Sequence, residues 1–196
     1  MLKRLFDLLA SFIGLLILLL PLLVISICVL FSGPGGIFYR QLRVGRYGKD
    51  FRLWKFRTMR PDSDKKGLLT VGGRDPRVTR VGYFLRKYKL DELPQLLNVL
   101  SGDMSLVGPR PEVRKYVDLY NDEQKRVLDV RPGITDYASI EYSDENELLA
   151  KSSDPEKTYI EEVMPAKLKL NAKYVAEMGL GTDMKIIFRT IGKILR

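Results

Sequence analysis

The chain has 196 residues, no histidine and a formal net charge of +9. This length allows one domain with a modest core, and the positive charge favours anionic partners such as phosphates, nucleic acid or a membrane surface. The lack of histidine excludes Ser-His-Asp triads, Cys-His dyads and histidine metal sites, so any metal would be a hard, oxygen-ligated ion such as Mg²⁺.

An uncharged apolar run covers residues 8–31, which is long enough to span a bilayer. Pro21 breaks this run, and the helix before it would be about 20 Å long, short of a hydrocarbon core of about 30 Å. Basic residues flank both ends, and the positive-inside rule would place both flanks on the cytoplasmic side. A kinked span and a re-entrant helix therefore both remain open, whereas no A-x-A pattern indicates a cleaved signal peptide.

Residues 37–59 alternate apolar and basic residues around a Gly-rich turn, which predicts a short hairpin or two extended segments. The aromatic residues there would either lie at the lipid headgroup level or cover a core. Residues 60–79 are polar and rich in turn formers, so we expect a loop. It contains the tripeptide Asp62-Ser63-Asp64, a D-x-D of the kind that holds metals in nucleotide-sugar transferases but that is also common in loops.

Helices are predicted next over three segments: 79–89, 91–101 and 112–128. In the second segment four leucines fall on one face, Pro94 fits the first turn, and Asp91 is the expected N-cap. A Pro-Gly turn is expected within residues 130–137.

The stretch 136–162 is acidic, and we expect a solvated loop there, although its acids would also suit contacts with sugar hydroxyls. A helix that starts or breaks near Pro165 follows. Residues 180–196 form a predicted basic amphipathic helix, which suits either an anionic membrane interface or packing on the core.

Two adjacent acids, Asp91 and Glu92, stand out because bases lie directly upstream of them. Downstream, Arg110 lies between Pro109 and Pro111, whose rings fix φ, so positioning the arginine costs little entropy. Arginine is suited to bidentate contact with phosphate. An Asp-Glu pair is usually a helix cap and Pro-Arg-Pro a rigid turn, so these residues alone leave a structural and a catalytic interpretation open.

Three motifs carry a family resemblance: KFRTM (55–59), LRKYKLDELPQLLNVLSGDMSLVGPRPE (85–112) and VRPGIT (130–135). With the proline-broken apolar segment before them, they resemble the small monotopic phosphoglycosyl transferases, bacterial sugar transferases that prime glycan assembly on a polyprenol carrier. The resemblance covers nearly all of the chain to about residue 135 and resumes at the C-terminal helix. Where many relatives read Gly-Trp-Ala after RPGIT, this chain has Asp136-Tyr137-Ala138, which leaves the sugar identity in doubt.

The resemblance implies that a sugar-1-phosphate passes from a UDP-sugar to undecaprenyl phosphate with release of UMP and with Mg²⁺ as cofactor. It makes Asp91 the nucleophile of a covalent phosphoglycosyl-aspartate and a contact of the metal, and Glu92 its partner. It also implies phosphate-binding positions for five bases: Lys55, Arg57, Arg86, Arg110 and Arg131.

The expected fold is mainly α with a small extended or β-hairpin element. We expect residues 1–36 to form a re-entrant membrane helix broken at Pro21. Residues 37–196 would form a compact catalytic domain with interfacial amphipathic helices, on the cytoplasmic face of the bacterial inner membrane.

The expected partners are a UDP-sugar, undecaprenyl phosphate and membrane phospholipids. A homodimer is compatible with this interpretation. Nucleic acid is not expected, because the bases match no DNA-binding module. A non-enzymatic membrane adaptor is the alternative, and it would need no fixed Asp-Glu and Pro-Arg-Pro arrangement.

Overall fold

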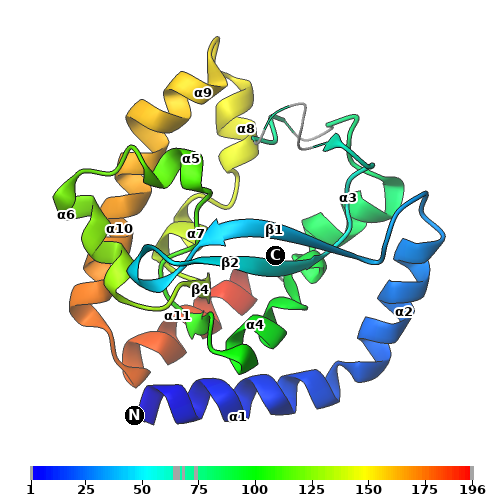
Figure 1. The fold of residues 1–196 in the computed structure, drawn as a ribbon, viewed down its shortest axis with the longest axis horizontal. Coiled ribbons are helices and arrows are strands. Elements are labelled where there is room, and N and C mark those ends of the chain that lie inside the picture. Colours follow the sequence, from blue (N-terminus) through cyan, green and yellow to red (C-terminus); the bar gives the residue numbers. More distant parts are fainter. Residues whose placement is uncertain (1, 64–66, 68, 73–74, 195–196) are drawn as a thin grey trace.

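The computed structural model describes residues 2–63, 67, 69–72 and 75–194, so Asp64 of the D-x-D tripeptide lies outside the described residues. The described chain is mainly helical with two small two-stranded sheets, which confirms the predicted fold class. Figure 1 shows helix α1 beneath the rest of the chain, with α2 turning away from its far end and the β1–β2 hairpin above.

Helices α1 (Leu2–Ile17) and α2 (Leu19–Leu30) form a pair bent by 64°. Among the described residues, no single helix is long and apolar enough to cross a membrane, whereas this bent pair meets both requirements together. The break lies at Leu18 rather than at Pro21, which is the third residue of α2. Because a proline ring clashes with the carbonyl four residues earlier, it ends the preceding helix at Ile17.

Both ends of this pair are attached to the same domain. At the start of α1, Lys3 Nζ lies 2.6 Å from Asp183 Oδ2, and the buried Asp7 accepts a hydrogen bond from Ser105 Oγ at 2.8 Å. At the end of α2, Arg57 Nη2 donates to the carbonyl oxygen of Val29 at 2.7 Å. The apolar residues between these attachments are largely exposed on the outer face of both helices.

Strands β1 (Phe38–Val44) and β2 (Asp50–Phe56) form the predicted hairpin, paired antiparallel from Phe38↔Phe56 to Val44↔Asp50. A 3-10 turn, η1 (Arg46–Gly48), connects them, with Tyr47 at a positive φ of 58°. Leu53 and Phe56 are both buried but lie three positions apart, so they point to opposite faces of β2 and join two different core clusters.

A second sheet pairs β3 (Ser105–Val107) with β4 (Gly133–Thr135) in parallel, where the sequence had predicted only a Pro-Gly turn. Gly108 and Gly133 pass each other closely here: a Cβ on Gly133 would lie 2.0 Å from the Gly108 nitrogen. The crossing needs two glycines because no real Cβ fits that space, and it joins the segment before Pro109 to the RPGIT motif.

Helix α3 (Arg80–Lys87) begins as predicted, with the Thr79 side chain capping it. The next predicted helix is shorter than expected: α4 (Gln95–Ser101) begins after Pro94, and Asp91 lies in a separate 3-10 turn, η3 (Leu90–Glu92). The prediction that Asp91 caps a helix is therefore wrong. Asp91 lies within η3, and α4 starts only after Pro94.

The single helix predicted over 112–128 is three short elements: α5 (Arg114–Val117), α6 (Asp122–Lys125) and the 3-10 helix η4 (Arg126–Asp129). A capping box formed by Asn121 and Gln124 starts the second of them. Such a box fixes a new helix start and so divides the segment.

The acidic stretch 136–162 is helical, so the expected solvated loop is wrong. It forms α7 (Tyr137–Glu141), α8 (Glu145–Ala150), α9 (Pro155–Thr158) and the start of a π-helix, η5 (Tyr159–Val163). Asp136 and Asp154 cap α7 and α9, while Leu149 and Tyr159 enter the core. The acids act as caps and outer faces, a pattern that composition alone does not distinguish from a loop.

Two longer helices complete the fold: α10 (Met164–Glu177), with Pro165 in its first turn as expected, and α11 (Leu180–Ile194). Helix α11 buries Asp183 and Ile186 against the domain but leaves Phe188 and Ile191 exposed. It thus has both a core-facing side and an exposed apolar strip.

The largest core cluster packs α10 against the hairpin end and the short helices. Its buried members are Val44, Val113, Tyr116, Val117, Tyr120, Val127, Leu149, Tyr159, Val163, Met164 and Leu168. This core lies behind the Pro109-Arg110-Pro111 segment and holds it toward η3.

Candidate active site

The centre of the candidate site is Glu92, which two cations from other elements hold in place. Lys55 on β2 lies 3.0 Å from Glu92 Oε1, and Arg110 donates to Glu92 Oε2 at 3.2 Å and also to Oε1. Burial alone would raise the pKa of Glu92, but the charges of Arg110 and Lys55 outweigh it and hold that pKa well below its usual range. Glu92 is therefore an ionised carboxylate locked between two bases.

Asp91, its neighbour, is equally buried but differently placed. Its exposed fraction is 6%, and within the described part of the chain its carboxylate accepts no hydrogen bond from another side chain. Burial raises the pKa of Asp91, against the attraction of Lys55. We had expected a helix N-terminus to keep Asp91 ionised. Asp91 lies in η3 instead, outside α4, and burial shifts its pKa upward, so the helix N-terminus does not supply that stabilisation.

The backbone turns both acids inward at Lys89, which has a positive φ of 56°. A left-handed conformation is uncommon for a residue with a side chain and costs of order 1 kcal/mol. Here it ends α3 and starts η3, so that two consecutive carboxylates are buried instead of pointing to opposite sides.

Arg86 approaches Asp91 from α3. Its Nε donates to Thr58 Oγ1 at 3.0 Å and its Nη1 to Thr70 Oγ1 at 3.3 Å. Burial lowers the pKa of the Arg86 guanidinium, while the negative charge of Asp91 opposes this shift. The structure thus brings Lys55, Arg86 and Arg110 together around the acids.

Arg57 and Arg131 lie elsewhere. Arg57 donates to the carbonyl oxygens of Val29, Gly33 and Gly36, so it closes the end of α2. Arg131 donates to the carbonyl oxygen of Gly102, which follows the far end of α4 from Asp91. A cation at a helix C-terminus is favourable there, which gives both arginines a structural role.

The sequence analysis missed the residues that hold the Pro109-Arg110-Pro111 segment. Arg43 donates to the Pro111 carbonyl oxygen and to Glu112 Oε1, both at 3.0 Å, and the buried Tyr159 hydroxyl donates to Glu112. The available signal was the position of Glu112, directly after the second proline.

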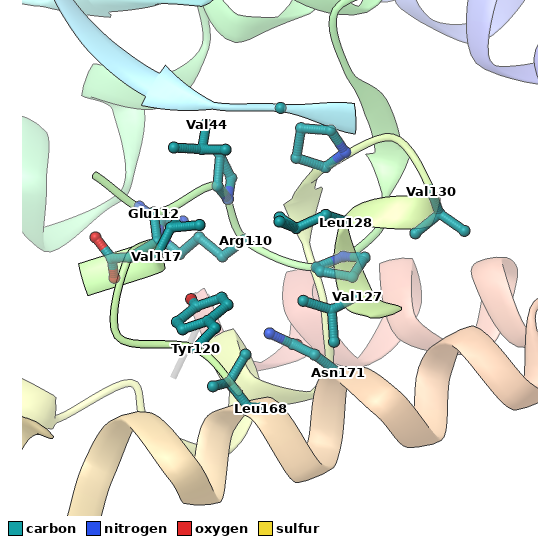
Figure 2. Close-up of a pocket in the computed structure, with 14 residues that line it drawn as sticks. Val44, Arg110, Glu112, Val117, Tyr120, Val127, Leu128, Val130, Leu168 and Asn171 are labelled. Atoms are coloured by element: carbon teal, nitrogen blue, oxygen red, sulfur yellow. The ribbon is translucent and has the colours of Figure 1, made fainter. Parts of the chain in front are cut away.

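A small cavity lies behind this segment, between the hairpin end and α10. In Figure 2, Leu168 and Asn171 project from α10 toward Tyr120 and Arg110. Its volume of about 20 Å³ is close to that of one water molecule. It is too small for a nucleotide sugar, and neither Asp91 nor Glu92 lines it, so it is not the substrate site.

The partners of Asp91 and Glu92 determine whether these acids could hold a metal ion. In the part of the chain that the structure describes, no group of three or more Asp, Glu or Cys side chains is placed to hold a metal ion. Glu92 is already paired with two bases, so Asp91 is the carboxylate of the two that has no ion pair among the described residues. One carboxylate suits Mg²⁺ where the substrate phosphates and water complete its coordination.

Comparison with known proteins gives a consistent result. The model of a family described as "Bacterial sugar transferase" matches residues 1–196. The chain is 41% identical to "Uncharacterized sugar transferase EpsL" of Bacillus subtilis (strain 168), over 99% of this chain and 87% of that protein.

Two further relatives are named after an activity. One is the UDP-N-acetylgalactosamine-undecaprenyl-phosphate N-acetylgalactosaminephosphotransferase of Aeromonas hydrophila, 37% identical over 98% of this chain and 43% of that protein. The other is the UDP-glucose:undecaprenyl-phosphate glucose-1-phosphate transferase of Escherichia coli (strain K12), 35% identical over 98% and 40%. The chain spans less than half the length of these two proteins.

Proposed function

The chain belongs to the bacterial sugar transferase family, and from this we propose that it transfers a sugar-1-phosphate from a UDP-sugar to undecaprenyl phosphate, an early membrane step of glycan assembly. The observation that carries the proposal is the unequal pair of buried carboxylates. Glu92 is locked by Lys55 and Arg110, while Asp91 accepts no hydrogen bond from another side chain in the described chain. Of the two carboxylates, Asp91 is therefore the one that we propose bonds to an incoming group.

In the proposed reaction an Asp91 carboxylate oxygen attacks the phosphorus that bears the sugar, and the bond from this phosphorus to UMP breaks. A phosphate oxygen of undecaprenyl phosphate then attacks the same phosphorus and releases Asp91. Splitting the transfer spares two anionic substrates from reacting directly. Arg86 and Arg110 neutralise the phosphoryl oxygens, and Glu92 fixes Arg110 and Lys55.

We also propose Mg²⁺ as the cofactor, held by Asp91 together with the substrate phosphates. When bound, it would neutralise phosphate charge and favour UMP as a leaving group. The nearby cations Lys55 and Arg86 both attract the negative charge of Asp91, so they would help to neutralise negative charge at the same place. Lys55 is itself buried, which lowers its pKa, and Glu92 counteracts this shift.

The activity test uses the purified protein with Mg²⁺, undecaprenyl phosphate and a panel of UDP-sugars, including UDP-glucose and UDP-N-acetylgalactosamine, with UMP as the readout. We expect UMP with at least one sugar and none with Asp91→Asn. Asp118→Asn, an exposed acid after α5, is the matched control and should keep full turnover. Turnover by Asp91→Asn, or none by the wild type, would reject the proposal.

The covalent step has its own test, in which undecaprenyl phosphate is left out. We expect intact-mass spectrometry to show one added sugar phosphate, and peptide mapping to place it on Asp91. Transfer that proceeds with no such adduct, even at short times, would favour direct attack by the acceptor phosphate instead.

We further propose that the α1–α2 pair enters and leaves the membrane on the cytoplasmic side. The support is geometric: Lys3 and Arg57 attach its two ends to one domain, while its outer face is apolar. The test replaces Cys28 with alanine and introduces single cysteines at Leu2 or Lys49. A membrane-impermeant maleimide should label both only from the cytoplasmic side, and labelling from opposite sides would refute the re-entrant topology.

A further inference from the structure

Asp136, the first residue after β4, is fully buried, and its carboxylate joins two parts of the chain. Its Oδ2 accepts a hydrogen bond from the Arg110 backbone nitrogen at 3.1 Å, and its Oδ1 accepts one from Ser139 N at 2.6 Å. One side chain therefore caps α7 and at the same time holds the centre of the Pro109-Arg110-Pro111 segment.

The Arg110 amide is the one backbone donor of that segment, because prolines have no N–H. The neighbouring peptide groups are held elsewhere: the Pro109 carbonyl oxygen accepts from Gly133 N at 3.0 Å, and the Pro111 carbonyl oxygen from Arg43 at 3.0 Å. Asp136 supplies the remaining contact. A buried N–H without an acceptor would be unfavourable by about 1–3 kcal/mol, so the carboxylate fixes the Arg110 backbone where its side chain leaves for Glu92.

The charge of Asp136 also bears on Arg110. Glu92 is the main cause of the raised pKa of the Arg110 guanidinium, and Asp136 adds to it from the backbone side. The arginine thus has one carboxylate partner on its guanidinium and a second one behind its main chain. Both favour its cationic form and one orientation.

We propose that Asp136 is a positioning residue for phosphoryl transfer, which holds the Arg110 backbone so that its guanidinium stays beside Glu92 and the substrate phosphates. This inference rests on the proposed function, because it gives Arg110 its task. It assigns a role to the position at which this chain carries an aspartate directly after the RPGIT motif.

A plain helix cap is the competing explanation, and the chain offers a matched control for it. Asp154 caps the short helix α9 by accepting from Lys157 N at 3.0 Å, and no hydrogen bond connects it with the candidate site. Asp136→Asn keeps one oxygen that can accept from Ser139 N, but its NH₂ group would then face the Arg110 N–H, where two donors meet. Asp136→Ser keeps a good helix cap, but its side chain is too short to accept from both N–H groups.

The experiment measures kcat and KM for UMP release by the full chain in detergent or nanodiscs. We expect Asp136→Asn and Asp136→Ser to lower kcat about tenfold, since a charge-assisted hydrogen bond is lost, with KM for the UDP-sugar changed less. Asp154→Asn should stay within about twofold of the wild type. In an Arg110→Ala background, Asp136→Asn should have little further effect on kcat, because the guanidinium that Asp136 positions is then absent.

A second readout needs no turnover. Arg110 has the only exchangeable backbone amide of the Pro-Arg-Pro segment, so hydrogen exchange of ¹⁵N-arginine-labelled protein reports on it directly. We expect faster exchange of this amide in Asp136→Asn and no change in Asp154→Asn. Unchanged exchange, a kcat within twofold, or an equal loss in the Arg110→Ala background would overturn the inference. If no UDP-sugar gives UMP, the proposed function fails, and the exchange result still decides whether Asp136 holds Arg110.

Discussion

Arg57, the residue directly after β2, donates to the carbonyl oxygen of Val29 and so connects the end of β2 to the end of α2. Its Nε and Nη2 also bond to Gly36 and Gly33. One buried guanidinium therefore satisfies three carbonyl groups where the apolar pair ends. This makes the KFRTM motif an attachment for the bent helices as well as the source of Lys55.

Replacing Arg57 should loosen that attachment. Arg57→Gln should lower the free energy of unfolding by about 1.5–3 kcal/mol, the range for hydrogen bonds to charged groups. The unfolding free energy of Arg57→Lys should lie between those of the wild type and Arg57→Gln, because one ammonium group cannot reach all three carbonyl oxygens. Thermal unfolding followed by circular dichroism measures this. Arg52→Gln, at an exposed position of β2, is the control, and equal melting temperatures for Arg57→Gln and Arg52→Gln would contradict the prediction.

The two acids should respond in opposite directions to amide substitution. Glu92→Gln leaves Lys55 and Arg110 without their counter-charge, so we expect a loss of about 2 kcal/mol in stability. Asp91→Asn removes a carboxylate whose ionisation burial disfavours, so stability should be unchanged or higher. Denaturant titrations of both variants provide the comparison. Similar destabilisation by both substitutions would contradict the described difference between an ion-paired Glu92 and an Asp91 whose ionisation is disfavoured by burial.

Activity should depend on pH through Asp91. The pKa of its carboxyl is raised above the usual value of about 3.9, so the nucleophilic anion forms only as the pH rises through that raised pKa. The acid limb of kcat/KM should therefore lie above pH 4. More Mg²⁺ should move it to lower pH, because a cation favours the anion. Profiles at two Mg²⁺ concentrations test this, and a limb that does not respond to Mg²⁺ would exclude Asp91 as a contact of the metal.

Stability should depend on pH through Glu92, whose pKa is shifted in the opposite direction from that of Asp91. The pKa of Glu92 is lowered in the folded state, so its contribution is complete above the unfolded value of about 4.3 and is lost as the pH falls through the folded pKa. Unfolding free energies measured from pH 6 downward should fall less steeply for Glu92→Gln than for the wild type. Parallel slopes would contradict the predicted ion pair.

The close passage of Gly108 and Gly133 gives a further prediction. Gly133→Ala would place a Cβ 2.0 Å from the Gly108 nitrogen, so β3 and β4 must separate and Arg110 must move. We expect loss of UMP release together with poor folding. Gly192→Ala, in α11, is the control: outside its own helix, the added Cβ would meet no described atom within 4 Å, so the change should be neutral or stabilising by up to about 1 kcal/mol. Full activity in Gly133→Ala would show that UMP release does not require the close contact between β3 and β4.

Local patterns predicted the elements whose own residues determine them. Alternation in 37–59 predicted the hairpin, and the helical spacing of apolar residues predicted α3. The β3–β4 pair was missed because each strand has three residues and their partners lie far apart in sequence. Helices α7 to α9 were missed because acidic caps resemble a polar loop.

Local sequence patterns also predicted only part of the candidate active site. Asp91, Glu92, Lys55, Arg86 and Arg110 were predicted and do lie together, because the motifs that carry them pack against each other. Arg57 and Arg131 share those motifs but point to helix ends, since a motif does not state which way each side chain turns. Asp136 appeared only as a departure from the family pattern, and its contact with Arg110 depends on a strand pairing that the sequence did not predict.

The attachment of Lys3 to Asp183 also has a consequence for biosynthesis, because the two residues are 180 positions apart. Helix α1 leaves the ribosome well before α11, which carries the acid that neutralises its lysine. Asp7 likewise has its partner Ser105 only 98 positions later. Domains fold largely as units during synthesis, so α1 is fully attached only after α11 has been made. Until then we expect its exposed apolar face to need shielding, by lipid or by a chaperone.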